Sequence, residues 1–89
     1  MNSHTTRRFR ELCAALPPGV KKQAVNAFKR FTKDPSHPGL RFKQVSAKSA
    51  AYSIRVSLNY RAVGILEGDM IVWFWIGKHG EYERLLNSL

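Results

Sequence analysis

An uninterrupted apolar run near the carboxyl end limits the possible folds of this chain more than any other feature. The run is MIVWFWI, residues 70–76, and it contains both tryptophans of the sequence. Seven residues are far too few to cross a bilayer, which takes about 20 in a helix. A strand that is apolar on every residue is buried on both faces. The run therefore predicts an interior strand of a sheet, with other elements covering each face.

Two helical patterns separated by a turn precede this strand. Residues 6–16 place Phe9, Leu12, Cys13 and Leu16 on one face of an amphipathic helix. The sequence PPG at 17–19 ends this helix, and a second helix is predicted over 19–33. Together they form a helical hairpin, which is expected to cover one face of the sheet. The sequence KDPSHPG at 33–39 predicts a loop.

After residue 39 the apolar residues alternate, which is typical of half-buried strands. Strands are predicted over 40–45, 52–57, 59–67 and 70–76, the last two joined by an EGD turn. Residues 80–89 return to helical spacing, and their leucines are the remaining candidates to cover the second face. The predicted fold is α+β: two N-terminal helices on a mainly antiparallel four-stranded sheet, with a short C-terminal helix, all in one domain over residues 1–89.

Positive charge dominates most of the chain. The sequence holds 15 Lys and Arg against 6 Asp and Glu, a net charge of +9. Residues 1–66 carry 13 of the basic residues and only 2 of the acidic ones. This distribution favours a polyanionic partner such as nucleic acid or an acidic protein, and less so a membrane surface. A surface that only keeps the protein soluble is the alternative interpretation.

Cysteine usage and the N-terminal residues bear on the cellular compartment. Cys13 is the only cysteine, so an internal disulfide is excluded, and no Cys/His spacing is typical of a zinc site. No metal or small-molecule cofactor is expected. The first twenty residues contain no apolar segment of the kind found in secretory signals, so a cytoplasmic protein is expected.

Polar side chains that can exchange protons follow the apolar strand directly. Lys78, His79, Glu81 and Tyr82 lie within five residues of Gly77. Histidine is the side chain best suited to give or take a proton near neutral pH, so His79 is a candidate acid or base. Tyr82 can donate a hydrogen bond to a phosphate oxygen or stack on a base. These residues make a candidate catalytic cluster, and a purely structural His–Tyr pair beside a helix start is the alternative.

Two arginines lie in the predicted strands that precede the apolar run. Arg55 is on the side of its strand opposite the apolar residues, and Arg61 falls among apolar neighbours. A charge in that position is costly to desolvate unless it is paired or faces a wet concavity. Guanidinium groups suit planar recognition of phosphate. Whether the two share a face depends on the turn at 57–59, and salt bridges to Glu67, Asp69 or the C-terminus are the alternative.

The helical hairpin, the stretch YSIRVSLNYRAVGILEGDMIVWFWIGKH and the Tyr-bearing end together resemble the RelE/ParE toxin superfamily of bacterial type II toxin–antitoxin systems. The resemblance covers most of the chain through short motifs: a strand with an aromatic residue followed by a basic one, a Tyr-Arg strand start, an acidic turn and an apolar strand ending in Gly. It implies a curved antiparallel sheet backed by two N-terminal helices. It also implies a cognate acidic antitoxin as a partner, which suits the net charge.

The resemblance implies two possible activities. RelE-like members cut mRNA on the ribosome without a metal, by attack of a 2′-hydroxyl on the adjacent phosphate, whereas ParE-like members inhibit DNA gyrase without catalysis. By the motifs, Arg55 and Arg61 match phosphate-binding positions, His79 matches a basic position after the last strand, and Tyr82 resembles a C-terminal tyrosine of several nucleases. Ser53 replaces a lysine of some members, and Tyr82 lies closer to the last strand than usual, which leaves the general base open.

The candidate site therefore has two parts. Arg55, Arg61, His79 and Tyr82 are the predicted catalytic residues, and the predicted RNA-binding residues are Lys43, Lys48 and Lys78. The first hypothesis is an mRNA-cleaving toxin whose partners are an antitoxin, mRNA and the ribosome, with no membrane. The second is a gyrase-inhibiting toxin, and the third is a basic RNA-binding domain or inactive orphan toxin.

Overall fold

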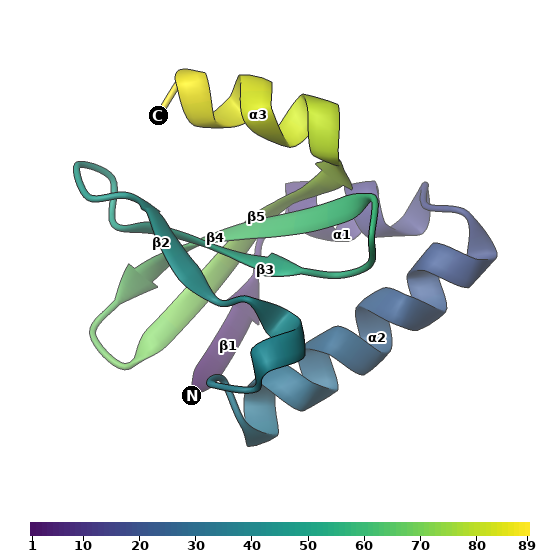
Figure 1. Cartoon of the computed structure of the whole chain (residues 1–89), viewed down its shortest axis with the longest axis horizontal. Helices are drawn as coiled ribbons and strands as arrows, with labels where there is room; N and C mark the ends of the chain where they lie inside the picture. The colour runs from purple at the N-terminus through teal and green to yellow at the C-terminus, as the bar shows by residue number, and fades with distance from the viewer.

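The computed structural model describes all 89 residues and contains one curved sheet of five strands (Figure 1). The strands are β1 (Asn2–Thr5), β2 (Lys43–Ser46), β3 (Ala51–Arg55), β4 (Tyr60–Glu67) and β5 (Met70–Lys78). Their order across the sheet is β1-β5-β4-β3-β2. The pairs from β2 to β5 are all antiparallel, so the predicted meander and the α+β class are confirmed.

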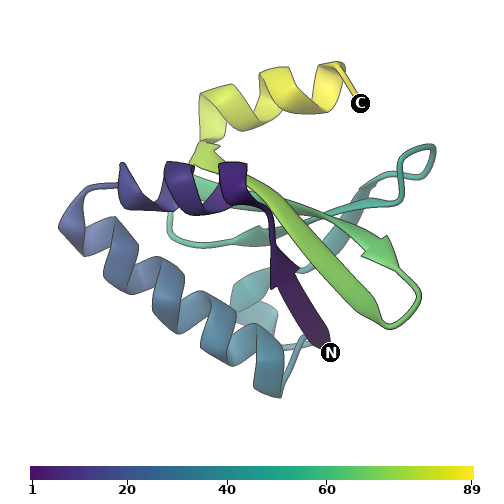
Figure 2. The ribbon, with the colours of Figure 1, turned by 180° about the vertical axis from the view of Figure 1, so that it is seen from behind.

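The predicted count of four strands is wrong, because residues 2–5 add a fifth strand. β1 pairs in parallel with β5, with Asn2 opposite Met70 and Thr5 opposite Trp73, at the sheet edge seen from behind in Figure 2. Its side chains are polar and exposed, so no apolar alternation marks it in the sequence. Backbone pairing holds β1 in place, together with a 2.7 Å hydrogen bond from Nε1 of Trp73 to Oγ of Ser3.

The helical hairpin consists of α1 (Arg7–Ala14) and α2 (Pro18–Lys33). Thr6 caps α1 by accepting a 3.1 Å hydrogen bond from the backbone N–H of Phe9. Pro18 is the first residue of α2, a position where its missing N–H removes no helical bond. The third helix, α3 (His79–Asn87), begins directly after β5. None of the three helices is long and apolar enough to cross a membrane.

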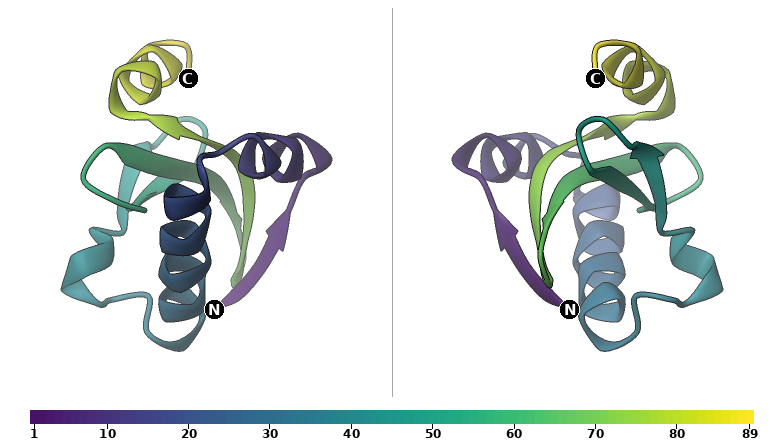
Figure 3. Two further views of the ribbon diagram at one scale, coloured as in Figure 1. Left: turned by 90° about the vertical axis from the view of Figure 1, so that its right-hand side faces the viewer. Right: turned by 90° about the vertical axis from the view of Figure 1, so that its left-hand side faces the viewer.

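The two faces of the sheet carry separate apolar clusters. The face toward α1 and α2 holds the larger cluster, in which Phe28 and Phe31 meet Trp73 edge-on, with ring centroids 5.2 Å apart in each case. Ala51, Val63 and Tyr82 form the smaller cluster on the other face, under α3. Figures 1 and 3 show the sheet curving between α2 and α3. The interior position predicted for residues 70–76 is therefore confirmed.

The strand predicted over 40–45 begins later than expected. Residues 38–40 form a short 3-10 helix, η1 (Pro38–Leu40), which buries Leu40 against the core. Arg41 then adopts a left-handed conformation with φ of 48°, and β2 starts only at Lys43. Pro38 fixes a turn conformation where the alternating pattern alone indicated extended chain.

A bulge between Val63 and Gly64 shifts the register of β4 against β5. A Cβ at Gly64 would lie 2.8 Å from Cε3 of Trp73 and 2.9 Å from Cγ1 of Ile71. Only glycine lets the two strands approach this closely. The bulge leaves Phe74 without a partner between the paired residues Trp73 and Trp75. Trp73 therefore packs toward α1 and α2, while Phe74 and Trp75 contribute to the face beneath α3.

Candidate functional site

Arg55 and Arg61 lie directly opposite each other on β3 and β4. Residues paired in this way point to the same face of an antiparallel sheet. The face is the one that carries α3, because Ser53 and Val63 share its parity and lie beneath that helix. The structure therefore brings together the two arginines whose relative placement the sequence left open.

The turn between β3 and β4 fixes the guanidinium of Arg61. Its Nη1 donates 3.1 Å hydrogen bonds to the carbonyl oxygens of Ser57 and Tyr60. Partial burial lowers the pKa of Arg61, the charges of Arg55 and Arg41 lower it further, and Tyr82 opposes this shift. Because an arginine pKa lies far above neutrality, the group stays charged at physiological pH.

No carboxylate neutralises these arginines. The structure contains two ion pairs, Arg7 with Glu11 and His79 with Glu83. Glu67 ends β4 at the opposite end of the strand from Arg61, about 20 Å away at the usual rise per residue. The alternative that Arg55 and Arg61 serve only as salt-bridge partners is therefore excluded. Like charges held close together without counter-ions favour an anionic ligand.

Two further basic residues extend this face. Lys43 is paired with Ser53 across β2 and β3, so its side chain has the same parity as Arg55 and Arg61. Arg41 precedes it by two residues and is close enough to lower the pKa of Arg61. Arg41, Lys43, Arg55 and Arg61 are referred to below as the basic face.

Tyr82 lies beside the basic face but is almost covered. The residue is 5% exposed and packs between α3 and the sheet, and its hydroxyl is 3.2 Å from Oγ of Ser53. The ring lies 6.5 Å from that of Trp75 and 5.7 Å from that of His79. Trp75 in turn covers Gly77, where a Cβ would lie 2.6 Å from its Cζ2 atom. Three aromatic rings therefore follow one another along the edge of the basic face.

His79 is the exposed member of this row. Its backbone N–H donates a 2.9 Å hydrogen bond to the carbonyl of Asn59, which ties the start of α3 to the β3–β4 turn. Its Nε2 lies 3.0 Å from Oε1 of Glu83, and half of the side chain is exposed. The β3–β4 turn thus holds both Arg61 and His79, at the right of the sheet in Figure 1.

Two of the predicted RNA-binding residues lie away from this face. Lys48 is in the turn between β2 and β3, at the far end of β3 from Arg55. Lys78 is exposed and paired with Tyr60, so strand alternation assigns it to the face opposite Arg61. Of the three predicted lysines, the structure brings only Lys43 together with the arginines.

Three residues of this region carry no distinctive signal in the sequence. Arg41 reads as part of a strand, and only the 3-10 turn before it directs it toward Arg61. Ser53 is an ordinary small polar strand residue until its partner on α3 is known. Trp75 belongs to the apolar run, and the bulge at Phe74 in β5 decides which face it occupies. The one hint in the sequence was that Arg41 is basic and lies two positions before Lys43, which places both on the same side of a strand.

A sequence model of the ParE-like toxin domain matches residues 18–84. The chain belongs to this family. The match includes all of the basic face together with His79 and Tyr82. No curated protein sequence matches the chain significantly.

Solved structures show the fold of this ParE-like toxin domain in other proteins. The RelB–RelE antitoxin–toxin complex from Methanococcus jannaschii aligns with a TM-score of 0.73 and 17% identity, over 92% of this chain and 96% of that one. YafQ from Escherichia coli BL21(DE3) aligns with a TM-score of 0.71 and 8% identity, over 91% and 96%. The YoeB/ParE toxin from Agrobacterium tumefaciens aligns with a TM-score of 0.68 and 12% identity, over 89% and 99%. The neighbours are toxins of toxin–antitoxin systems, at identities that establish a shared fold.

Proposed function

We propose that this ParE-like domain is the toxin of a type II toxin–antitoxin system and that it cleaves mRNA on the ribosome. The observation that carries the proposal is the placement of Arg55 opposite Arg61 on an uncovered part of the sheet, without any carboxylate partner. His79 lies at the same end of the sheet, held by the same turn. Two cations on neighbouring strands beside a proton-exchanging group suit a reaction at a phosphate.

In the proposed reaction a 2′-hydroxyl of the RNA attacks the adjacent phosphorus. The bond from phosphorus to the 5′-oxygen breaks, which leaves a 2′,3′-cyclic phosphate on one fragment and a 5′-hydroxyl on the other. Negative charge grows on the phosphate oxygens in the transition state, and Arg55 and Arg61 stabilise it. His79 exchanges the proton, as the base for the 2′-hydroxyl or the acid for the 5′-oxygen.

In this proposal Tyr82 positions its neighbours His79 and Trp75 rather than contacting the RNA. Its hydroxyl is engaged with Ser53 and its ring is nearly covered, so direct contact with RNA is restricted in this conformation. The ring instead supports His79 on one side and Trp75 on the other. The partly exposed rings of Trp75 and His79 are the ones available to stack against an unpaired base.

The test is inducible expression in bacteria of the wild type, of Arg61→Ala and of Arg8→Ala. Arg8 is an exposed arginine of α1 without an ion pair, so it controls for the loss of one charge. Wild type and Arg8→Ala are expected to arrest growth and to create new mRNA 5′ ends. Arg61→Ala, at equal protein level, is expected to lose both effects.

Growth arrest by Arg61→Ala as strong as that of the wild type would contradict the mechanism. Arrest with intact mRNA would contradict the ribonuclease proposal altogether. A supercoiling assay with DNA gyrase then separates the alternative, inhibition of gyrase by binding, from an effect on neither target. RNA binding without arrest would instead indicate an inactive RNA-binding domain.

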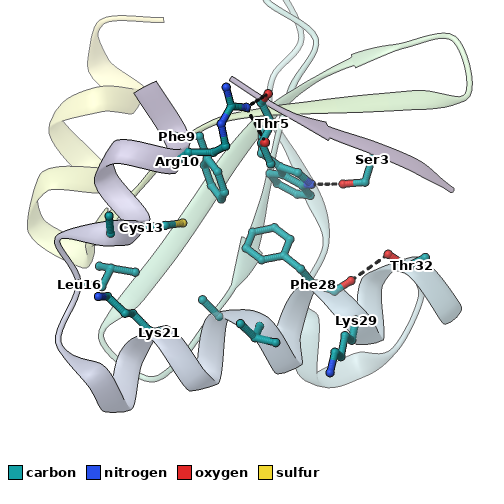
Figure 4. Close-up of a pocket in the computed structure, with 14 residues that line it drawn as sticks. Ser3, Thr5, Phe9, Arg10, Cys13, Leu16, Lys21, Phe28, Lys29 and Thr32 are labelled. Atoms are coloured by element: carbon teal, nitrogen blue, oxygen red, sulfur yellow. Dashed lines mark hydrogen bonds between the residues drawn. The ribbon is translucent and has the colours of Figure 1, made fainter. Parts of the chain in front are cut away.

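We also propose a cognate acidic antitoxin as the partner, and the groove between α1 and α2 as one place where it docks. The groove has a volume of about 680 Å³ and an apolar floor that includes Phe9, Phe28 and Trp73. Burial raises the pKa of the Cys13 thiol, so this side chain is neutral and adds to the apolar lining. Figure 4 shows Arg10, Lys21 and Lys29 around it. An amphipathic segment with acidic flanks complements both features.

A further inference from the structure

A second hollow lies behind the basic face, between α2, η1 and the turn from β3 to β4. It has a volume of about 290 Å³. Its polar lining comes from two separate parts of the chain: Gln23, Asn26 and Arg30 from α2, and Arg55 and Ser57 from the end of β3 and the turn that follows. No acidic residue lines it. These elements lie together at the lower right of the sheet in Figure 1.

We infer that this hollow, referred to below as the turn pocket, binds one nucleotide of single-stranded RNA next to the phosphate that is cleaved. The inference rests on the proposed ribonuclease function for its choice of RNA. It adds a subsite beyond the basic face, built from α2, η1 and the β3–β4 turn.

Arg55 connects the turn pocket to the basic face. It is paired with Arg61 across the sheet, and it also lines the turn pocket. Ser57 makes a second connection, because its carbonyl oxygen accepts the hydrogen bond from Arg61 and the residue borders the turn pocket. Strand alternation directs the Arg55 side chain to the α3 face, so the basic face and the turn pocket meet at the β3–β4 turn. RNA that passes around this turn from a phosphate between the two arginines would place an adjoining nucleotide at the mouth of the turn pocket.

The remaining polar groups suit a nucleotide. The carboxamides of Gln23 and Asn26 are one helical turn apart, each with a donor and an acceptor for the edge of a base. Arg30 supplies a cation for a second phosphate, and its Nη1 would lie 3.9 Å from a Cβ at Gly39, so the guanidinium lies over η1 beside the turn pocket. The side chains of Gln23, Asn26, Arg30 and Arg55 make no ion pair and no side-chain hydrogen bond within the chain.

Leu58 supplies an apolar contact at the rim. It is the most exposed large apolar side chain of the protein, at 73%, and it lines the turn pocket from the β3–β4 turn. An isolated leucine in this position has no core to pack against, whereas a base or ribose beside the two carboxamides would cover it. The volume is near the lower limit of ligand pockets, about 300 Å³, which favours a single unpaired nucleotide over a larger ligand.

The experiment measures the affinity of the full chain for a 2′-O-methyl RNA tetranucleotide, which cannot be cleaved by 2′-hydroxyl attack. Arg30→Gln is compared with Lys33→Gln, because both remove one positive charge from α2 and only Arg30 lines the turn pocket. Arg30→Gln is expected to weaken binding at least ten-fold, and Lys33→Gln less than three-fold. The backbone amide signals of Gly39 and Ser57 are expected to shift on titration with the tetranucleotide.

Equal losses in the two variants, with unmoved Gly39 and Ser57 signals, would overturn the nucleotide subsite even if the protein cleaves RNA. Inorganic phosphate that shifts the same signals and displaces the tetranucleotide at comparable concentration would also overturn it, and would leave a simple anion site. Conversely, the protein could bind the tetranucleotide in a way that depends on Arg30 and yet cleave no RNA. This outcome would support the nucleotide subsite and contradict the ribonuclease function. Asn26→Ala is expected to change the base preference of binding, which a charge effect alone cannot do.

Discussion

The contact between Ser53 and Tyr82 is the one buried polar pair between α3 and the sheet. Removing one hydroxyl leaves the other without a partner, whereas removing both lets an apolar contact replace the pair. Tyr82→Phe and Ser53→Ala are each expected to lower the free energy of unfolding by about 1 kcal/mol. The double variant is expected to lose less than the sum, as measured by urea denaturation of all four proteins. Strict additivity would mean that the two hydroxyls do not interact in solution.

Separate substitutions of His79 and Glu83 distinguish proton exchange by His79 from the contribution of the ion pair between the two residues. Both are exposed and lie one helical turn apart, so neither substitution should disturb the core. His79→Ala is expected to slow RNA cleavage by a factor of about 100 or more, because it removes the proposed proton-exchanging group. Glu83→Ala is expected to change the rate by less than about ten-fold. Cleavage by purified variants on programmed ribosomes measures both, and equal effects would assign the pair a structural role.

Single residues also show how far the sequence can locate the site. Residue type and strand pattern were enough to single out Arg55 and Arg61, because a charge in a mostly apolar strand is costly to bury unless it has a partner or a ligand. The pattern did not show that they face each other, because this depends on how Ser57–Asn59 close the turn and hence on register. Lys48 illustrates the opposite case. Its charge made it a candidate, but the strand between it and Arg55 places it at the other end of the sheet.

The turn between β2 and β3 contains a residue in a conformation that glycine adopts more easily. Ala50 has φ of 52°, in the left-handed region that costs a residue with a Cβ about 1–2 kcal/mol. Ala50→Gly relieves this cost but also gives the unfolded chain more conformational entropy, which offsets part of the gain. The net effect is expected to raise the free energy of unfolding by about 0.5 kcal/mol. Ala47→Gly, in the same turn without a positive φ, is expected to lower it. Thermal unfolding of both variants tests the sign, and the same sign in both would show that φ does not decide the outcome.

The groove between α1 and α2 leads to a prediction about the antitoxin. Val25 lines the groove and is 51% exposed, so Val25→Glu adds a charge there without opening the core. This charge would repel an acidic segment and is costly to bury against an apolar one. The variant is expected to arrest growth like the wild type but to escape neutralisation when the cognate antitoxin is co-expressed.

Asn87→Glu is the matched control for this experiment, because it adds the same charge at the end of α3, on the other face of the sheet. It is expected to remain neutralised. If the antitoxin neutralises Val25→Glu as well as it does Asn87→Glu, the groove is not where the acidic segment docks. Loss of growth arrest by Val25→Glu itself would instead assign the groove to the toxic activity.

Whole elements were predictable where apolar periodicity was strong. The α1–α2 hairpin, the antiparallel meander and α3 all have a clear 3.6- or 2-residue pattern, and each exists close to its predicted bounds. β1 has no such pattern, because polar residues at a sheet edge are held by backbone pairing, which side-chain periodicity does not record. The short helix η1 was not predicted for a related reason, since a turn rather than a strand buries Leu40.

At the scale of the whole molecule, charge is separated along the sheet. The basic face is near the β3–β4 turn, while Glu67 and Asp69 are in the β4–β5 turn at the other end of the same hairpin. An RNA strand would therefore be attracted to one end of the protein and repelled from the other.

Salt dependence measures how many of these charges bind phosphate. For single-stranded nucleic acid the slope of log K against log salt is about −0.7 for each phosphate neutralised, so contact with all four basic-face residues gives about −3. Lys43→Gln is expected to make this slope less steep by about 0.7, whereas Lys48→Gln, with the same charge loss at the other end of β3, is expected to leave it unchanged. The measurement is fluorescence anisotropy of a 2′-O-methyl RNA octanucleotide between 50 and 400 mM NaCl. Equal changes in the two variants would mean that the net charge of +9, rather than the geometry of the basic face, attracts the RNA.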